Sequence, residues 1–402
     1  ESDTIMKIDS IKIKNFKAFK DVEIKKLPSL CVFVGANGVG KSTLFSLFDF
    51  LKTAFTSSVT VALNKMGGVR GIEEVRSRKS SEPIEIQLKF REAEGKPLVT
   101  YELVFSALNG KAIIKREVLQ YRRGNHGKPW KFLDFSEGHG IAITNEAALL
   151  DSRDGTLQEE RSEQSLKSPD ILAIKGLSQF SDFPVVEALG NLIENWHISN
   201  INIEQARQEP TMDYSEHLSA KGDNLALVLQ YYKEYQPEVL ETIIKQFQES
   251  IPGMDSITPL TTEDGKVLLK LKDGSFDLPF LAKYVSDGTI KMLAYLTLLN
   301  APLHPPLLCV EEPENQLYVE LLFKLAEQFR LYAGEKGQVF VSTHSPDFLN
   351  ALRPEEVFLI SKKDGYSTIS CLGDDSQIVQ FCKDGDLLGY LWKEGLFSRG
   401  TH

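Results

Sequence analysis

The chain has 402 residues, of which 42% are hydrophobic and 25% are charged, so a globular fold with a sizeable buried core is expected. Its net charge of −10 argues against a protein coated in basic surface, and no apolar stretch is long enough to span a bilayer. The N-terminal residues lack the order of a secretion signal and the four cysteines lack metal-ligand spacing, which together predict a cytoplasmic protein with reduced thiols.

Strands dominate the first part of the chain. Alternating apolar and polar residues predict strands over 6–13 and 22–24, and the continuous apolar run Leu30–Val34 predicts a strand buried on both faces. A glycine-rich turn and an amphipathic helix follow. Further strands are predicted over 84–90, 98–105, 113–121 and 131–134. Together these segments indicate a strand-rich layer attached to the first half of the fold.

The middle of the chain changes from polar to helical. Residues 137–170 are rich in charged and small side chains, which favours a loop with one short helix. Apolar residues recur at helical spacing over 183–196 and 224–250, with a break at Pro237. These helices are predicted to form an insertion.

The last part alternates strands with helices. Strands are predicted over 267–271, 307–310, 339–342 and 357–360, and helices over 288–299 and 316–331. Such alternation implies a mainly parallel sheet with helices on its faces. Asp384 and Asp386 are expected to form a turn before a last helix over 387–392.

A phosphate-binding loop is predicted after the strand Leu30–Val34. Residues 35–42 fit the pattern G-x-x-x-x-G-K-[ST], in which glycines let successive backbone N–H groups point at phosphate oxygens. Lys41 is expected to reach the β- and γ-phosphates of ATP, and the Ser42 hydroxyl to bind Mg²⁺. The predicted nucleotide-binding residues of this loop are Asn37, Gly38, Gly40, Lys41, Ser42 and Thr43.

Two carboxylates follow the strand predicted over 307–310. Glu311 and Glu312 lie at its carboxyl end, where open α/β sheets bind ligands. Glu311 is expected to hold Mg²⁺ directly or through water, and Glu312 to orient and polarise the attacking water as a general base. The alternative to a catalytic site is an acidic turn after the strand. For an isolated pair of glutamates this alternative stays open, so other motifs are needed to support a site.

Two such motifs occur in the sequence. Downstream, the strand over 339–342 leads to His344, whose neutral ring could hydrogen-bond the γ-phosphate or the water. Upstream, Ser286 and Gly288 open a helix whose hydroxyl and free N–H groups could hold a second phosphate. One chain does not need two phosphate cradles for one nucleotide, whereas two chains arranged head to tail do. The sequence therefore predicts an ATP-dependent homodimer.

These motifs resemble those of the ABC-type ATPases of the RecF, SMC and OLD group. The matching segments, in the family's order, are 13–19, the Walker A loop 35–43, the signature 286–289, the Walker B run 307–312 and the switch 343–346. The resemblance implies that Ser286 and Gly288 contact the γ-phosphate bound to the partner subunit, that Glu312 is catalytic, and that His344 is the switch. It also implies that residues 15–19 lie near the adenine.

The chain departs from the family's pattern at two places. Glu311 stands where many relatives have Asp, although OLD-like proteins share this feature. Tyr318 and Val319 stand where many relatives have His-Pro, in the D-loop that follows Walker B.

The resemblance also implies a fold and a domain division. The fold class is α/β, a P-loop NTPase of ABC-ATPase type with a strand-rich N-terminal layer and a helical insertion. We predict an N-terminal half of the ATPase domain over 1–136, a polar loop and helical insertion or arm over 137–260, and a C-terminal half over 261–402. Residues 347–402 are too few for the TOPRIM nuclease domain of OLD relatives, and the apolar run 387–392 is expected to dock on the protein's own core, a partner being the alternative.

The function implied by the resemblance is that of a switch. Stand-alone ATPases of this type, such as those of the PARIS and Septu anti-phage systems, work with a nuclease or toxin encoded beside them. The chain is therefore expected to hydrolyse ATP slowly and to control a separate effector in anti-phage defence. The alternative is a RecF-like ATPase of DNA repair or recombination that acts on DNA. A membrane-transporter ATPase is disfavoured, because the signature lacks the longer Gly-Gly-Gln form.

A predicted hairpin gathers basic residues that could contact nucleic acid. Tyr121 and Trp130 are interleaved with them, and only Glu117 opposes them. The candidate contacts are Lys115, Arg116, Arg122, Arg123 and Lys128. Basic side chains neutralise phosphates, and aromatic rings could stack on unpaired bases. The alternative is a solvated strand face with its aromatics packed beneath.

Overall fold

The structure is a computed structural model and describes residues 5–122, 128–151 and 157–398. It divides into two compact units. Unit 1 comprises residues 1–196 and 355–374, and unit 2 comprises residues 197–354 and 375–402. The three-part division predicted from the motifs, with boundaries after residues 136 and 260, stays a prediction.

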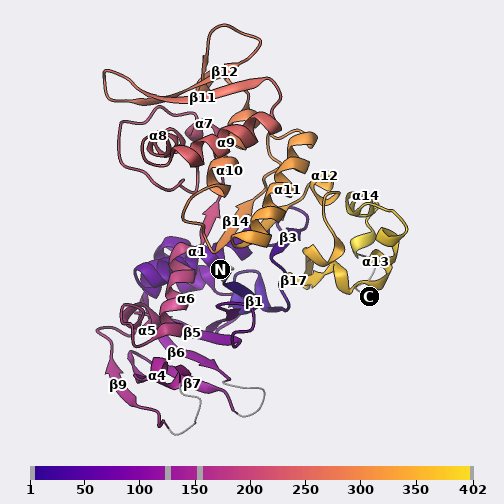
Figure 1. Cartoon of the computed structure of the whole chain (residues 1–402). Coiled ribbons are helices and arrows are strands. Elements are labelled where there is room, and N and C mark those ends of the chain that lie inside the picture. The colour runs from indigo at the N-terminus through magenta and orange to yellow at the C-terminus, as the bar shows by residue number, and fades with distance from the viewer. Residues whose placement is uncertain (1–4, 123–127, 152–156, 399–402) are drawn as a thin grey trace. The chain divides into compact units, whose positions relative to one another are not determined.

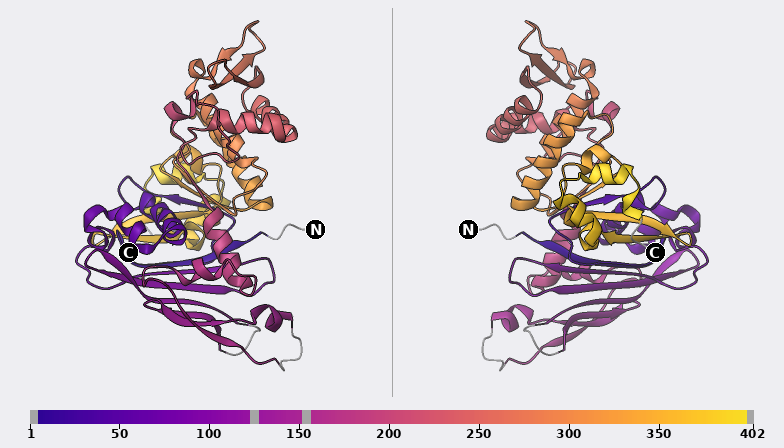
Figure 2. Two further views of the ribbon diagram at one scale, coloured as in Figure 1. Left: turned by 90° about the vertical axis from the view of Figure 1, so that its left-hand side faces the viewer. Right: turned by 90° about the vertical axis from the view of Figure 1, so that its right-hand side faces the viewer.

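Unit 1 contains a large antiparallel sheet, whose strands run side by side in Figure 2. Within the described residues its order is β2-β1-β4-β5-β6-β7-β8-β9. The strands are β1 (Lys7–Phe16), β2 (Phe19–Ile24), β4 (Ile84–Arg91), β5 (Val99–Leu108), β6 (Lys111–Tyr121), β7 (Trp130–Ser136), β8 (His139–Ile143) and β9 (Arg161–Ser165). On β4, Ile84, Ile86, Leu88 and Phe90 are fully buried, and the side chains between them are partly exposed. The sheet therefore has one face on the core and one polar face, as the alternation predicts.

The helices of unit 1 pack beside a second group of strands. β3 (Leu30–Val34) pairs in parallel with β16 (Val357–Lys363), which pairs antiparallel with β17 (Tyr366–Cys371). All five residues of β3 are buried, which confirms the prediction of an interior strand. The helices are α1 (Lys41–Thr56), α2 (Val59–Gly67), α3 (Ile72–Val75), α4 (Glu146–Asp151), α5 (Ala173–Leu177) and α6 (Pro184–Asn195). Edge-to-face ring contacts join α1 to its surroundings, Phe45 to Phe33 and Phe48 to Trp196.

Residues 137–170 contain more regular structure than their composition predicts. β8 and β9 extend the sheet, so the prediction of a loop with one short helix is wrong for these strands. β9 has the sequence Arg-Ser-Glu-Gln-Ser and four of its five residues are exposed. As an edge strand it is held by backbone hydrogen bonds to β8 rather than by burial of apolar side chains, so it lacks the alternation that marks a strand.

Unit 2 contains three parallel strands with helices beside them. β14 (Leu307–Glu311) pairs in parallel with both β10 (His197–Ser199) and β15 (Gln338–Thr343). The flanking helices are α10 (Asp287–Leu299) and α11 (Val319–Glu335), and α10 is buried from Gly288 to Leu299. Parallel strands alternating with helices confirm the fold predicted for this part of the chain.

The start of α11 differs from the prediction. The helix begins at Val319, three residues after the predicted start at Gln316. Gln316 has a φ of 68°, in the left-handed region that a right-handed helix does not use. Apolar residues at helical spacing continue into the turn before Val319, but the backbone of that turn is not helical.

The middle of unit 2 combines helices with a small sheet, near the top of Figure 1. The helices are α7 (Ile203–Ala206), α8 (Leu225–Tyr235) and α9 (Pro237–Ser250), and the break at Pro237 is confirmed. Three strands follow in the order β11-β12-β13, at Met254–Thr261, Val267–Asp273 and Phe280–Leu281. β11 contacts both α8 and α9, and sequence patterns did not predict it. Only two positions of β11, Ile257 and Pro259, are buried. The alternation of apolar and polar residues that would predict this strand is therefore weak.

The C-terminal helices of unit 2 dock on the protein's own core. α12 (Pro346–Leu349) contacts α14 (Leu388–Lys393), and α13 (Ser376–Lys383) precedes it. Leu388 and Leu391 are 2% and 1% exposed, which confirms the prediction for this apolar run. The Gly389 N–H donates a hydrogen bond to Asn350 Oδ1 over 2.8 Å.

Replacing Gly389 should dislodge α14. A Cβ at this position would lie 1.9 Å from the Pro346 carbonyl oxygen and 2.4 Å from Asn350 Oδ1. We expect Gly389→Ala to lower the free energy of unfolding by about 1–3 kcal/mol through overpacking, measured by urea denaturation. Gly334→Ala is the matched control, because no atom lies within 4 Å of its Cβ position in α11, and it should be neutral or slightly stabilising. Equal stability of the Gly389→Ala variant and the wild type would contradict the packing.

Two glutamates of unit 1, Glu117 and Glu146, are almost completely buried. Glu146 is 0% exposed, accepts a hydrogen bond from the Tyr121 hydroxyl, and has a second oxygen, Oε2, with no hydrogen-bond partner in the described part of the chain. Glu117 is 1% exposed and accepts hydrogen bonds from Tyr101 and from the first N–H groups of α5. Burial raises the pKa of both carboxyl groups to about 7.

The pKa values of these glutamates predict a loss of stability with rising pH. The unfolded chain releases each proton near pH 4.5, whereas the folded protein keeps it until about pH 7. The free energy of unfolding should therefore fall between these values, by up to about 3 kcal/mol for each group. Glu146→Gln should make the fall of the free energy of unfolding with pH less steep, and the part of the fall due to Glu117 should remain. Urea unfolding from pH 5 to 8 measures this slope. An unchanged slope in the variant would contradict the assignment.

Candidate nucleotide-binding site

The Walker A loop of unit 1 joins β3 to α1 with a left-handed backbone. Gly38 and Gly40 have φ values of 78° and 119°, which residues other than glycine rarely adopt. Gly40 is also the N-cap of α1, so the helix starts at Lys41. Asn37 and Gly38 are exposed, as is Ser42, and Thr43 is half-buried. The loop thus has the backbone and the exposed hydroxyl that a phosphate cradle requires.

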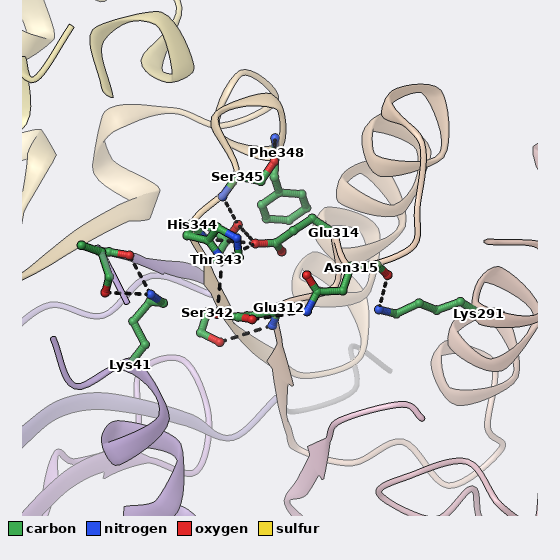
Figure 3. Close-up of polar contacts among 12 residues, drawn as sticks. Lys41, Lys291, Glu312, Glu314, Asn315, Ser342, Thr343, His344, Ser345 and Phe348 are labelled. Carbon is green, nitrogen blue, oxygen red and sulfur yellow. Dashed lines mark hydrogen bonds and ion pairs between the residues drawn. The ribbon is translucent and has the colours of Figure 1, made fainter. Parts of the chain in front are cut away.

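The Walker A lysine is folded back onto its own loop. Lys41 is 6% exposed, and its Nζ donates hydrogen bonds to the carbonyl oxygens of Gly35 and Ala36 over 2.6 and 3.1 Å, as Figure 3 shows. The ammonium group is therefore held at the loop, where it can move from these carbonyls to a phosphate.

β16 and β17 pack against the Walker A loop. The Ser367 hydroxyl donates to the carbonyl oxygen of Val39, and a Cβ at Gly40 would lie 2.7 Å from that hydroxyl. A Cβ at Gly35 would lie 2.6 Å from the Ile360 carbonyl oxygen. Sequence patterns did not identify Ser367, because its role depends on a contact with a residue 328 positions away.

The hairpin between β1 and β2 lies beside the same loop. Asn15 and Lys17 have φ values of 58° and 47°, and the side chain of Asn15 donates to the Pro83 carbonyl oxygen over 3.2 Å. The ring of Phe19 is 3.6 Å from a Cβ built at Gly40. Its place near the adenine stays a prediction.

In unit 2, the Walker B strand β14 ends at a half-buried carboxylate. Glu311 accepts a hydrogen bond from Asn200 Nδ2 over 3.1 Å. Burial raises the pKa of Glu311, and the charge of Glu312 adds to this effect. Asn200 follows β10, the strand paired with β14, and sequence patterns did not identify it. A polar residue directly after that short strand was the available signal.

Glu312 occupies an unusual backbone conformation. Its φ is 39°, and its N–H donates to the Ser342 carbonyl oxygen over 2.9 Å. One carboxylate oxygen accepts a hydrogen bond from Asn315 Nδ2 over 3.3 Å, and the other lies 3.3 Å from His344 Nδ1. Left-handed conformations of residues other than glycine cluster at functional sites. The turn directs this carboxylate toward His344.

His344 lies between two carboxylates of unit 2. Its Nδ1 is 3.3 Å from Glu312 Oε1 and 3.3 Å from Glu314 Oε1, and Figure 3 shows these side chains pointing toward one another. Glu314 also accepts hydrogen bonds from the Thr343 hydroxyl and the His344 N–H over 2.8 and 3.0 Å. Its other oxygen, Oε2, is buried and has no hydrogen-bond partner in the described part of the chain. Sequence patterns did not identify Glu314, although it follows Glu312 by two residues.

The signature helix α10 begins with a side-chain cap. Ser286 Oγ accepts a hydrogen bond from the Thr289 N–H over 3.4 Å and lies 2.7 Å from the Thr289 hydroxyl. A Cβ at Gly288 would lie 3.1 Å from the Gln316 carbonyl oxygen, so the helix start adjoins the D-loop of the same unit. Arg207 donates to Asp287 Oδ1 over 2.6 Å, and sequence patterns did not identify it.

Lys291 joins the signature helix to the D-loop. It is 3% exposed, and its Nζ donates to the Asn315 carbonyl oxygen over 2.6 Å. Burial lowers its pKa to about 8, and the charges of Glu314 and Glu312 partly offset this effect. Together with Glu312, Asn200 and Gln316 it lines a cavity of about 450 Å³. Sequence patterns did not identify this lysine.

Comparison with known families decides the assignment. Residues 30–350 match the family described as "AAA domain, putative AbiEii toxin, Type IV TA system". The chain belongs to this family. As a member of this AAA family it has the α/β fold of P-loop NTPases of ABC-ATPase type, which confirms the predicted fold class.

Solved structures similar to this AAA-family chain include heads of SMC proteins. One is an SMC head bound to the C-winged helix domain of ScpA, with 14% identity, a TM-score of 0.48, and coverage of 90% of this chain and 96% of that chain. The head domain from Thermotoga maritima has 14% identity, a TM-score of 0.46, and coverage of 91% and 98%. The head from Pyrococcus furiosus, with an extended coiled coil, has 15% identity, a TM-score of 0.45, and coverage of 94% and 100%.

Each unit, taken by itself, contains a group that suits a nucleotide or its magnesium ion. In unit 1, a Cβ at Gly35 or Gly40 would collide with Ile360 or Ser367, so the loop requires glycine there, and the Ser42 hydroxyl is exposed. In unit 2, Glu311 presents a carboxylate at a strand end. No group of three or more His, Cys, Asp or Glu able to hold a metal occurs among the described residues. Such a group is not required, because Mg²⁺ at P-loops takes few protein ligands and the phosphates supply others. None of the described helices has the length and apolar character needed to cross a membrane.

The predicted nucleic-acid patch of this AAA-family chain differs from its expected form. Lys115 and Arg116 form ion pairs with Glu137 and Glu102 over 2.7 and 3.4 Å. Glu117 is buried, so the prediction that it alone opposes the patch is wrong: strand pairing brings acidic residues from other segments beside the basic ones.

The aromatic part of that patch also differs. Tyr121 is 2% exposed and stacks on Phe132 at 4.2 Å, as in the alternative with aromatics packed beneath. Arg122 and Lys128 are exposed, and Arg123 lies outside the described residues. A nucleic-acid contact of these residues stays a prediction.

Proposed function

We propose that this protein binds and hydrolyses ATP and acts as an ATP-dependent dimeric switch that controls a separate nuclease or toxin in anti-phage defence. The observation that carries the proposal is the hydrogen-bonded set in unit 2. It connects Glu312 through Asn315 to Lys291 on the signature helix. A change at the catalytic carboxylate can thus reach the surface proposed to meet a second copy.

The proposed chemistry assigns a role to each part of the site. Lys41 and the N–H groups of the Walker A loop bind the β- and γ-phosphates. Ser42 and Glu311 would hold Mg²⁺, which neutralises charge on the phosphate oxygens. Glu312 accepts a proton from the attacking water, and His344, held between two carboxylates, responds to the state of the γ-phosphate.

The proposed dimer follows from the two phosphate-binding motifs. Ser286 and Gly288 stand at the start of a helix of 13 residues, where N–H groups attract anions. We propose that they cap the ATP held by the Walker A loop of a second copy. The Ser286 hydroxyl caps its own helix, so a phosphate would add to or replace this bond.

The effector is the least direct part of the proposal. Its support is the family description, which names a toxin and a toxin–antitoxin system. PARIS- and Septu-like systems are the proposed setting, with the protein in the cytoplasm. The alternative is a RecF-like ATPase acting on DNA, which is favoured by a cationic groove on unit 1 that is described below.

Affinity purification from the native cells tests the switch. Tagged wild-type protein, Glu312→Gln and Lys41→Ala should be compared with and without ATP. We expect a nuclease or toxin chain to co-purify with the wild type. ATP should change the amount of this chain that co-purifies with Glu312→Gln, and it should not change the amount that co-purifies with Lys41→Ala. The absence of any such chain, together with ATPase stimulation by DNA ends, would favour the alternative.

A further inference from the structure

Unit 1 has a groove lined by cations on the polar face of its large sheet. Its volume is about 620 Å³, and its basic lining residues are Lys89, Arg91, Lys96 and Arg122. The other lining residues include the polar side chains of Gln87, Thr100 and Gln120 and the apolar side chains of Pro97, Leu98 and Pro129. None of the described residues that line the groove carries a carboxylate side chain. Positive charge is thus gathered at one place in a protein whose net charge is −10.

The groove is a product of strand register. On β4, Gln87, Lys89 and Arg91 alternate with fully buried apolar residues, so all three lie on the face opposite the core. Thr100 of β5 is the partner of both Lys89 and Gln120, which brings β6 beside them. The 91–98 turn adds Lys96, whose carbonyl oxygen accepts a hydrogen bond from Arg91 over 2.6 Å.

These cations differ from several others on the same sheet, which have acidic partners. Elsewhere, Lys14 pairs with Glu85, and Arg116 with Glu102, over 3.6 and 3.4 Å. Lys115 and Lys131 likewise have acidic partners. Among the described residues, no ion pair within 4 Å is formed by any of the four groove cations, although Glu92 lies near Lys96 in the turn. The groove cations are therefore available to an external anion.

We propose that this groove binds the phosphate backbone of nucleic acid without reading its sequence. Long cationic side chains spread over two strands and a turn suit a polyanion, because each can neutralise a separate phosphate. Stacking on bases by Tyr121 is not available, since that ring is buried against Phe132. The proposal moves the contact surface away from Lys115 and Arg116, and it does not depend on ATP hydrolysis.

A pair of triple variants tests the groove. Lys89→Ala, Lys96→Ala and Arg122→Ala are combined in the first, which leaves Arg91 to hold the turn. The control combines Lys115→Ala, Arg116→Ala and Lys131→Ala, three exposed cations of the same sheet with acidic partners. Fluorescence anisotropy would measure binding of a labelled duplex of about 30 base pairs and a single strand of the same sequence, without ATP, over a range of salt.

The groove variant should bind at least about ten times more weakly than the wild type, and the log–log slope of its affinity against salt should be shallower by about 0.9 for each phosphate that is no longer neutralised. The control should change affinity by less than about threefold, and Lys89→Arg with Arg122→Lys should retain binding. Equal decreases in affinity in both triple variants, wild-type affinity in the groove variant, or competition by inorganic triphosphate as strong as by DNA would overturn the proposal. Melting temperatures and ATP binding of the variants report their folding, and DNA binding by Lys41→Ala separates this site from the proposed switch.

Discussion

Glu312→Gln should bind ATP but hydrolyse it about 100 to 10,000 times more slowly than the wild type, the range expected for loss of a general base. The amide keeps the size of the side chain and can still accept the hydrogen bond from Asn315, so the turn at φ 39° should persist. It cannot take a proton from water. Phosphate release under saturating ATP and Mg²⁺ measures the rate.

Glu320→Gln is the matched control for this experiment. Glu320 is an exposed carboxylate in the first turn of α11, eight positions after Glu312 and outside the hydrogen-bonded set around His344. Its substitution should leave hydrolysis unchanged. Hydrolysis by Glu312→Gln at the wild-type rate would show that another group activates the water.

Lys41→Ala should abolish measurable ATP binding. Each charge-assisted hydrogen bond to a phosphate contributes about 1.5–3 kcal/mol, so loss of the ammonium group should weaken binding by roughly 100-fold or more. Lys41 Nζ lies 2.6 Å from the Gly35 carbonyl oxygen, so its ammonium group is already beside the loop that is expected to bind the phosphates. Calorimetric titration with a non-hydrolysable ATP analogue measures the change.

Folding must be separated from binding in this variant. Alanine removes the donor that serves two loop carbonyl groups, so the melting temperature should be recorded beside the titration. Lys65→Ala, which removes an exposed lysine paired with Asp49, is the control and should bind as the wild type does. Tight binding by a folded Lys41→Ala would contradict the assignment of the loop.

The sequence predicts those parts of the site that depend on local patterns. β3 is recognisable because a strand buried on both faces needs a continuous apolar run, and the loop after it because its backbone needs glycine at 38 and 40. β14 and β15 follow the same rule. Their polar ends at Glu311 and His344 stand out because carboxyl ends of parallel strands bind ligands.

Contacts between distant segments could not be predicted in the same way. Lys291 looks like one basic residue in an apolar helix, and only the fold shows it bound to the Asn315 carbonyl oxygen. Ser367 looks like a polar residue in a strand, yet it supports the Walker A loop. The ion pairs of Lys115 and Arg116 depend on strand register, which no single segment encodes.

We propose that ATP joins two copies of the chain, and sedimentation velocity of Glu312→Gln can measure this association. We expect one chain per particle without nucleotide or with ADP, and two chains per particle with ATP and Mg²⁺. Adding Lys41→Ala to the same variant should restore the single chain. A particle of unchanged size under all three nucleotide conditions would contradict the claim.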